Sequence, residues 1–185
     1  IPDNELRKHS SYDNKGYVFE WQGEVYRAIY KSYQADVEAL FTSGLVEALV
    51  KEGVFPRTEV TNLSTSDSEF IIWHSMIPVV TMPNEWTFSM LKDAASVVVF
   101  VNQISRKFGY QTIDAHGFNV LFFQGSPVFV DLGSFVKIER DFRSGLVGWR
   151  PYGEFCRSFM APLRLWSSGD SYLARKSLLG EQMPM

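Results

Sequence analysis

Three side chains able to hold a metal ion or to accept a proton stand close together in the sequence. Asp114 and Asn119 are five positions apart in the run I-D-A-H-G-F-N, and Asp131 follows in the run V-F-V-D-L-G-S. Carboxylate and amide oxygens are the ligands that Mg²⁺ prefers, and a carboxylate can also take the proton of an attacking hydroxyl group. These residue types could act together if the fold brings them to one place.

The elements that must position these residues are two short apolar runs, Val120–Phe123 and Val128–Val130. The four residues Q-G-S-P between them include Gly and Pro, which favours a β-hairpin closed by a turn. The polar run 114–119 would then form the loop before the hairpin, and Asp131 would follow its second strand. A hairpin therefore predicts that the three oxygen-bearing side chains meet at one end of a small sheet.

The same residues also have a purely structural interpretation. Asp and Asn are common in turns and caps, and the spacing D-x-x-x-x-N often arises by chance. The ordered succession of an apolar helix, a polar loop, a hairpin and D-x-G favours a particular fold more than it favours activity. A fold can persist after its chemistry is lost.

The succession D-x-H-x-x-N, hairpin, D-x-G resembles the catalytic segment of the protein-kinase-like fold, in particular that of the aminoglycoside phosphotransferases. The matching residues are Asp114, His116, Asn119, Asp131 and Gly133. The resemblance implies an α+β, two-lobed fold, with a small antiparallel β lobe and a mainly helical lobe that carries a β-hairpin after the catalytic-type loop. It also implies ATP and Mg²⁺ as cofactors, Asp114 as the catalytic base and Asn119 and Asp131 as metal ligands. His116 would brace the loop at the cofactor site, or be an ordinary loop histidine.

Two elements that hold the ATP phosphates in the protein-kinase-like fold have no counterpart in this sequence. Gly16 and Gly23 are isolated, so a G-x-G-x-x-G loop is missing. The strand expected over Val25–Tyr30 carries Arg27 in place of a lysine, and a guanidinium is not equivalent to an ammonium group. Arg27 is thus a candidate cofactor contact or a surface arginine, and phosphotransfer activity is doubtful.

A helix is expected over Tyr33–Glu52, because apolar residues recur there every three or four positions. Gly44 lies inside this pattern and leaves two short helices as an alternative. Glu38 and Glu47 both lie on the expected helix, and either is a candidate partner for Arg27 at the cofactor site. The choice between them stays open, as does the alternative that both are solvated.

The chain is expected to divide into three regions. These are a poorly ordered leader over residues 1–15, a small β-rich lobe with one helix over 16–84 and a mainly helical lobe over 85–185. Pro83–Glu85 suits a hinge between the lobes. The expected elements are strands at Tyr17–Trp21, Phe70–His74 and Ile77–Met82, a loop at Thr61–Ser68, a buried helix at Trp86–Phe108, a short activation-type loop at Gly145–Gly148, and a helix at Tyr152–Met160 that Pro162 ends.

A wider resemblance covers roughly residues 16–166. The runs S-G-L-V-E-A-L-V, P-N-E-W-T-F-S-M-L-K-D-A-A, D-A-H-G-F-N-V-L-F and W-R-P-Y-G-E-F-C-R-S-F-M-A-P-L are similar to the N-terminal region of bacterial nodulation NoeA-like proteins and of proteins described as SAM-dependent methyltransferases. The resemblance implies that the chain is a fragment, with a methyltransferase domain after residue 185. The fragment would be a non-catalytic substrate-binding or scaffold domain of that protein, or would modify its substrate.

SAM itself is not expected to bind this fragment. The run V-F-V-D-L-G-S looks superficially like a SAM-binding strand end, but Phe135 stands where a further Gly is needed for close approach to the cofactor. Too few residues follow Asp131 to complete a doubly wound sheet. The expected ligand is therefore a small-molecule substrate whose identity the sequence does not reveal.

Composition narrows the class of protein. The 185 residues are 45% hydrophobic and 21% charged, as in ordinary globular domains, and the net charge of −3 gives no electrostatic footprint for nucleic acid. A single cysteine, Cys156, allows no internal disulfide and fits a reducing cytoplasm. No apolar run approaches the ~20 residues of a membrane span, so neither nucleic acid nor a membrane is expected as a partner.

Overall fold

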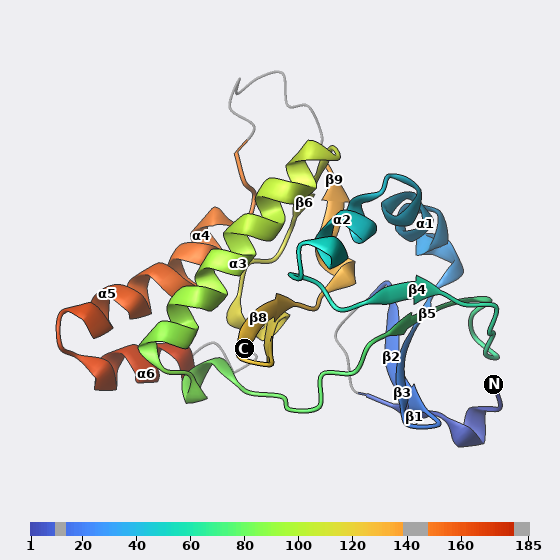
Figure 1. The fold of residues 1–185 in the computed structure, drawn as a ribbon, viewed down its shortest axis with the longest axis horizontal. Coiled ribbons are helices and arrows are strands. Elements are labelled where there is room, and N and C mark those ends of the chain that lie inside the picture. The colour runs from blue at the N-terminus through green and yellow to red at the C-terminus, as the bar shows by residue number, and fades with distance from the viewer. Residues whose placement is uncertain (10–13, 139–147, 180–185) are drawn as a thin grey trace. The chain divides into compact units, whose positions relative to one another are not determined.

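The computed structural model of the protein describes residues 1–9, 14–138 and 148–179 (Figure 1). The chain divides into two compact units, Ile1–Ile77 and Pro78–Met185, whereas the boundary expected from the sequence lies between residues 84 and 85. A five-stranded antiparallel sheet lies in the first unit, and two two-stranded sheets lie with four helices of the described chain in the second. The expected α+β class is confirmed.

The sheet of the first unit has the strand order β1-β2-β3-β5-β4, and all of its neighbouring strands are antiparallel. Its aromatic and aliphatic side chains form a core of Tyr17, Phe19, Tyr26, Ala28 and Ile71. This core explains why runs rich in aromatic residues form these strands. The strands are β1 (Arg7–Lys8), β2 (Gly16–Trp21), β3 (Glu24–Ile29), β4 (Thr58–Val60) and β5 (Phe70–His74).

The hairpin of β2 and β3 closes through only two residues, Gln22 and Gly23, whose φ angles are 52° and 81°. Two successive residues at positive φ are typical of a type I′ turn, which matches the twist of the flanking strands. The strands expected over Tyr17–Trp21 and Val25–Tyr30 are confirmed. A turn this short contains no extended glycine-rich loop.

The expected helix over Tyr33–Glu52 is divided in two. The short 3₁₀ helix η2 (Lys31–Tyr33) leads into α1 (Gln34–Thr42), and α2 (Leu45–Lys51) follows. Gly44, between α1 and α2, has a φ of 81°, a left-handed conformation that glycine adopts at little cost. The sequence alternative of two short helices is therefore correct, and the single helix is wrong.

One further expectation for this part of the chain needs correction. Residues 77–82 form no strand, and Val79 and Val80 are 63% and 60% exposed, because this segment pairs with no strand of the sheet. The strand at Thr58–Val60, which was not predicted, pairs with β5. Within residues 1–15, the stretch expected to be a poorly ordered leader, the structure places η1 (Asp3–Glu5) and β1, while residues 10–13 lie outside the described residues.

The second unit is organised around α3 (Phe88–Lys107), which packs against β6 and β8. Thr87 caps this helix, since its Oγ1 accepts a hydrogen bond from the backbone N–H of Met90 at 3.3 Å. Gly109 follows the helix with a φ of 82°. The expected buried helix is confirmed, and its buried residues are Leu91, Ala94, Ala95, Val97, Val98, Val101, Asn102, Ile104 and Ser105.

Two small antiparallel sheets lie beside α3. Strands β7 (Val120–Phe123) and β8 (Ser126–Phe129) form the expected hairpin, with a turn of two residues rather than four. Gln124 and Gly125 make this turn with φ angles of 50° and 81°, so it has the same form as the β2–β3 turn. A second pair, β6 (Tyr110–Thr112) with β9 (Phe135–Lys137), encloses both the loop and the hairpin and was not predicted.

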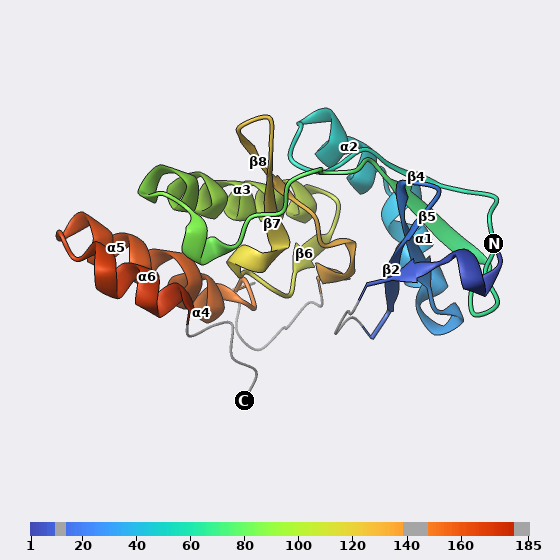
Figure 2. The same ribbon diagram turned by 90° about the horizontal axis from the view of Figure 1, so that it is seen from below.

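The helices after the unit's sheets are α4 (Tyr152–Phe155), the π-helical turn η6 (Cys156–Met160), α5 (Ala161–Ser167) and α6 (Ser171–Leu179). Helix α5 lies beside α6 (Figure 2). The helix expected over Tyr152–Met160 is present, but Pro162 does not end it. Pro162 lies in the first turn of α5, where a missing N–H is tolerated. The expected activation-type loop overlaps residues 139–147, outside the described residues.

Candidate functional site

Hydrogen bonds join the loop before the hairpin to the segment after it. The backbone N–H of Ile113 donates to the carbonyl of Ser134 at 2.9 Å, and the N–H of Asp114 donates to Oγ of Ser134 at 3.2 Å. At the other end of the loop, the N–H of Val130 donates to the carbonyl of Asn119 at 2.9 Å. The two ends of the D-x-H-x-x-N loop are thus held against the chain on either side of Asp131.

Close packing fixes the middle of the loop. A Cβ atom at Gly117 would lie 2.7 Å from Cγ of Pro83 and 3.3 Å from a ring carbon of Trp86. Pro83 belongs to the short 3₁₀ helix η3 (Pro83–Glu85), and Trp86 is fully buried. Only glycine therefore fits at position 117 with this backbone, and the loop rests directly on η3. The role of Pro83–Glu85 as a hinge remains a prediction.

The two expected magnesium ligands have different environments. Asn119 is 8% exposed, and its Nδ2 atom has no hydrogen-bond partner among the described residues. The Oδ1 atom of Asp131 accepts a 2.9 Å hydrogen bond from the backbone N–H of Gly133 and so caps η5 (Leu132–Ser134). Asp131 thus has a structural role, as the alternative interpretation of the sequence expects. A metal role for either residue remains a prediction.

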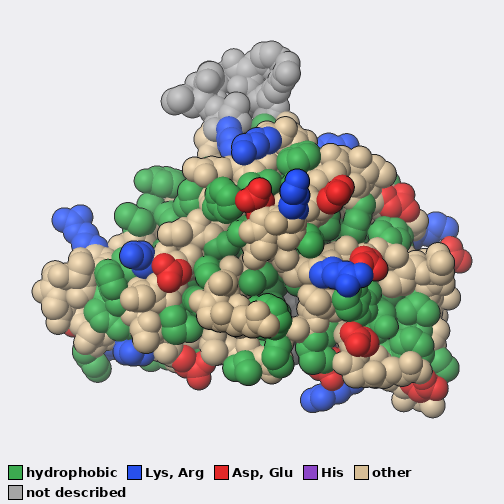
Figure 3. Space-filling view, viewed as in Figure 1, with side chains coloured by type: hydrophobic (Ala, Val, Ile, Leu, Met, Phe, Trp, Pro, Cys, Tyr) green, Lys and Arg blue, Asp and Glu red, His purple; other side chains and the backbone are tan. Residues whose placement is uncertain are grey.

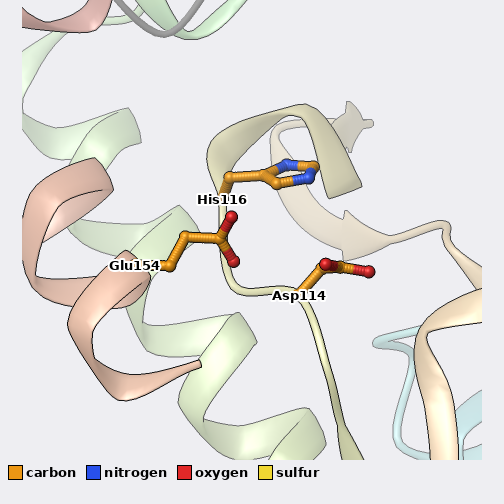
Figure 4. Close-up of side chains that lie close together, drawn as sticks. All are labelled: Asp114, His116 and Glu154. Carbon is orange, nitrogen blue, oxygen red and sulfur yellow. The ribbon is translucent and has the colours of Figure 1, made fainter. Parts of the chain in front are cut away.

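A cluster of three ionisable side chains lies beside this loop. Asp114, His116 and Glu154 each place one possible ligand atom within 4.8 Å of the other two, and all three side chains are partly exposed. Figure 4 shows Asp114 and His116 on the loop and Glu154 reaching toward them from α4. The cluster therefore joins two segments that are distant in the sequence.

A hydrogen bond positions Glu154, whereas ring packing positions His116. Oε2 of Glu154 accepts a hydrogen bond from the backbone N–H of Ala115 at 2.6 Å, which fixes the carboxylate against the loop. The ring of His116 packs edge-on against Phe118, with 5.8 Å between ring centroids. Its Nδ1 atom is buried and has no hydrogen-bond partner among the described residues.

Glu154 is the member of this cluster that the sequence did not reveal. It lies in the run W-R-P-Y-G-E-F, within the wider resemblance, but no spacing rule links it to a loop 39 positions earlier. Its place in the first turn of a helix also has an ordinary explanation, because acidic residues are favoured there.

The candidate residues of the first unit lie on the sheet and on its helices. Arg27, in β3, is 8% exposed and pairs in register with Ile72 of β5. Glu38 is exposed, and its Oε1 accepts a 2.7 Å hydrogen bond from Nε2 of Gln34, while Glu47 is exposed on α2. The structure corrects the surface interpretation of Arg27, because the strand face that carries it is buried. Its contact with a cofactor, and the choice between the glutamates, remain predictions.

Charged side chains of both signs are interspersed on the face of the molecule that Figure 3 shows. Among the described residues, none of the helices is both long and apolar enough to cross a membrane.

No protein-family model matches the chain. A search of curated proteins finds similarity to "Nodulation protein NoeA" of Rhizobium meliloti (strain 1021), with 27% identity over 163 residues. The match covers 85% of the chain but only 33% of NoeA, so the chain spans about a third of the length of the curated relative it matches. The chain is thus weakly similar to one part of a longer nodulation protein.

Proposed function

We propose that the chain is a non-catalytic substrate-binding domain of a larger, nodulation-type protein, and that it presents a small molecule to a methyltransferase domain elsewhere in that protein. The observation that carries this proposal is the similarity to NoeA, which includes 85% of the chain and only 33% of the relative. A stretch that matches a third of a longer protein is expected to act as one of its parts. The methyltransferase assignment follows from the wider sequence resemblance.

The form of the first sheet favours binding over phosphotransfer. The β2–β3 hairpin turns through Gln22 and Gly23 alone, which leaves no loop of backbone amides to surround phosphate groups. Strand β3 offers Arg27 where a lysine would be expected. A domain without these two phosphate contacts can still bind a ligand at its other polar groups.

The ligand that this proposal favours is a small molecule rich in hydroxyl groups. The partly exposed side chains of Asp114, His116 and Glu154 provide hydrogen-bond acceptors, and the hydrogen bonds to Ser134 and Ala115 hold their backbone in place. Acceptors fixed before binding lose little conformational entropy when a hydroxyl group donates to them.

Saturation-transfer NMR with a mixture of hydroxylated metabolites, free of ATP and of SAM, tests the proposal. At least one compound should receive magnetisation from the protein, and Asp114→Asn should weaken this signal. The exposed Glu59→Gln substitution in the first unit is the control and should leave the signal unchanged. If the chain converts ATP to ADP in the presence of Mg²⁺, with transfer of the phosphoryl group to a hydroxyl group or to water, and Asp114→Asn abolishes this, the chain is a catalyst and the non-catalytic proposal is wrong.

A second candidate function is magnesium-dependent phosphotransfer by a protein-kinase-like fold. It is favoured by the hydrogen bonds that hold the D-x-H-x-x-N loop against the end of the hairpin, as the resemblance requires. Asn119 and Asp131 would hold Mg²⁺ on ATP, and Asp114 would take the hydroxyl proton. Their donor set fits Mg²⁺, because it consists of an amide and a carboxylate oxygen.

A thermal-shift measurement separates the two candidates. Phosphotransfer requires that ATP with Mg²⁺ raise the melting temperature and that Asp131→Ala remove this shift. The binding domain predicts no such dependence on Asp131. A shift with SAM would instead place the methyl donor on this chain and contradict the expected domain order.

A further inference from the structure

We propose that Asp114, His116 and Glu154 form a binding site for a divalent transition-metal ion, with Mn²⁺ and Zn²⁺ as the probes. This site differs from the magnesium site of the phosphotransfer candidate, since it uses neither Asn119 nor Asp131. It uses the same three side chains as the proposed small-molecule site, but metal binding is measured without that molecule and so is tested separately from the proposed function.

The distances between the side chains suit such an ion after small rotations. One possible ligand atom of each residue lies within 4.8 Å of the other two. Carboxylate oxygens and imidazole nitrogens bind Zn²⁺ at about 2.0–2.2 Å, which places neighbouring ligand atoms roughly 3–3.5 Å apart. Because all three side chains are partly exposed, an ion can enter from solvent, and Oε1 of Glu154 can bind it while Oε2 keeps its hydrogen bond from Ala115.

The unsatisfied nitrogen of His116 is a second, independent indication of a ligand. Its Nδ1 atom is buried without a hydrogen-bond partner among the described residues, and buried polar atoms are rarely left in that state. Either ring nitrogen of His116 can bind a metal ion, and an ion bound at Nδ1 would give this atom a partner.

The backbone around the cluster already provides the support that metal ligands usually have. Ligating carboxylates are commonly held by further hydrogen bonds. Here the N–H of Ala115 donates to Glu154, and the N–H of Asp114 donates to Ser134, which is fully buried. Two of the three ligand-bearing residues are therefore fixed by contacts outside the cluster.

The donor set selects the class of ion. Two carboxylates and one imidazole offer both oxygen and nitrogen, which suits Mn²⁺ and Zn²⁺, whereas Mg²⁺ and Ca²⁺ prefer sites made of oxygen alone. Two negative carboxylates also match the charge of a divalent ion. We therefore expect Mn²⁺ or Zn²⁺ to bind more tightly than Mg²⁺, and the bound ion to link the loop to α4.

Isothermal titration of the metal-stripped chain with ZnCl₂, MnCl₂ and MgCl₂ tests the site, in the absence of any nucleotide or small-molecule ligand. Glu154→Gln keeps an oxygen that can accept from Ala115 but removes the charge, and His116→Gln removes the imidazole. Each substitution should weaken Zn²⁺ binding by at least about tenfold. His9→Gln is the matched control, because Nε2 of His9 lies 3.0 Å from Oε1 of Glu20 at an exposed place in the first unit.

Binding that survives both substitutions, or that His9→Gln weakens equally, would overturn the proposal. A variant that fails to fold is recognised by its circular dichroism, and the wild-type chain then provides the decisive measurement. Sub-stoichiometric Mn²⁺ should broaden the backbone NMR signals of Ala115 and Glu154 before those of Gly133. Broadening centred on Gly133, or spread evenly over the chain, would show that the ion binds elsewhere.

Discussion

The backbone N–H of Ala115 donates a 2.6 Å hydrogen bond to the carboxylate of Glu154, although the two residues are 39 positions apart. Ala115 is fully buried, so a water molecule cannot replace the carboxylate as the acceptor of its N–H group. This bond therefore joins α4 to the loop that carries the candidate site. A substitution on α4, which is distant from the loop in the sequence, is therefore expected to change the stability of the loop.

Replacing Glu154 by Ala should destabilise the second unit by about 1–3 kcal/mol, because a buried N–H group is left without its acceptor. Glu154→Gln retains an acceptor oxygen and should lose less. Urea unfolding followed by tryptophan fluorescence measures both changes, with the exposed Glu69→Ala as control. Equal losses for the Ala and Gln variants would show that the hydrogen bond does not stabilise the loop.

Gly117→Ala should destabilise the protein by roughly 1–3 kcal/mol, since overpacking against a rigid neighbour forces the backbone to move. The new methyl group would lie 2.7 Å from the ring of Pro83. Gly148→Ala is the matched control in the same unit, because a Cβ there meets no atom within 4 Å. Chemical denaturation should separate the two variants, and HSQC spectra should place the change around His116 and Asn119. Similar stabilities would contradict the close packing of the loop.

His74 should make the stability of the protein depend on pH in acid. Burial, and secondarily the charge of Arg27, lowers the pKa of His74 from its ordinary value near 6.5 to about 3. Its Nδ1 lies 2.9 Å from Oγ1 of Thr58, and this hydroxyl donates its proton to the carbonyl of Pro56. Nδ1 is therefore the protonated nitrogen of a neutral imidazole.

The sign of the effect follows from proton binding. Between about pH 3 and pH 6.5 the unfolded chain binds a proton at His74 and the folded chain does not, so stability falls as the pH falls through this window. Above about pH 6.5, His74 does not make the stability depend on pH. The full loss is on the order of 5 kcal/mol, and His74→Leu should remove it. Urea midpoints at pH 7 and pH 4.5 check this, and equal pH slopes for both proteins would contradict the neutral buried imidazole.

Asp170→Ala should destabilise α6 by about 1 kcal/mol, because the carboxylate caps this helix. Its Oδ1 accepts a hydrogen bond from the backbone N–H of Leu173 at 2.9 Å. Asp170→Asn keeps an acceptor and should change stability by only a few tenths of a kcal/mol. Differential scanning calorimetry of the two variants measures the difference, and a loss as large for Asn as for Ala would rule out the cap.

The elements that the sequence predicts well are those with a local pattern. The three-to-four spacing of apolar residues located α3, and two apolar runs around Gly125 located the β7–β8 hairpin. The split at Gly44 followed from the same reasoning, because glycine interrupts a helical pattern and adopts positive φ. Local sequence patterns thus predict most of the helices and strands around the candidate site.

The missed features depend on contacts between distant residues. The pairing of β6 with β9 and the short strand β4 carry too few residues to show a period of two. No pattern of residue spacing in the sequence predicts the hydrogen bond from Ala115 to Glu154. The expectation that Pro162 ends a helix came from a rule for helix interiors. This rule does not apply to a proline in the first turn of a helix.

The π-helical turn η6 has a consequence for the orientation of Glu154. A π turn spans about one more residue than an α turn, and one residue corresponds to roughly 100° of rotation about a helix axis. The bulge at Cys156–Met160 therefore offsets the angular phase of α4 from that of α5. Removing one residue from it would restore a continuous α-helix and swing the Glu154 carboxylate by about a quarter turn, away from Ala115. The direction in which this acid points is thus encoded by a single extra residue downstream of it.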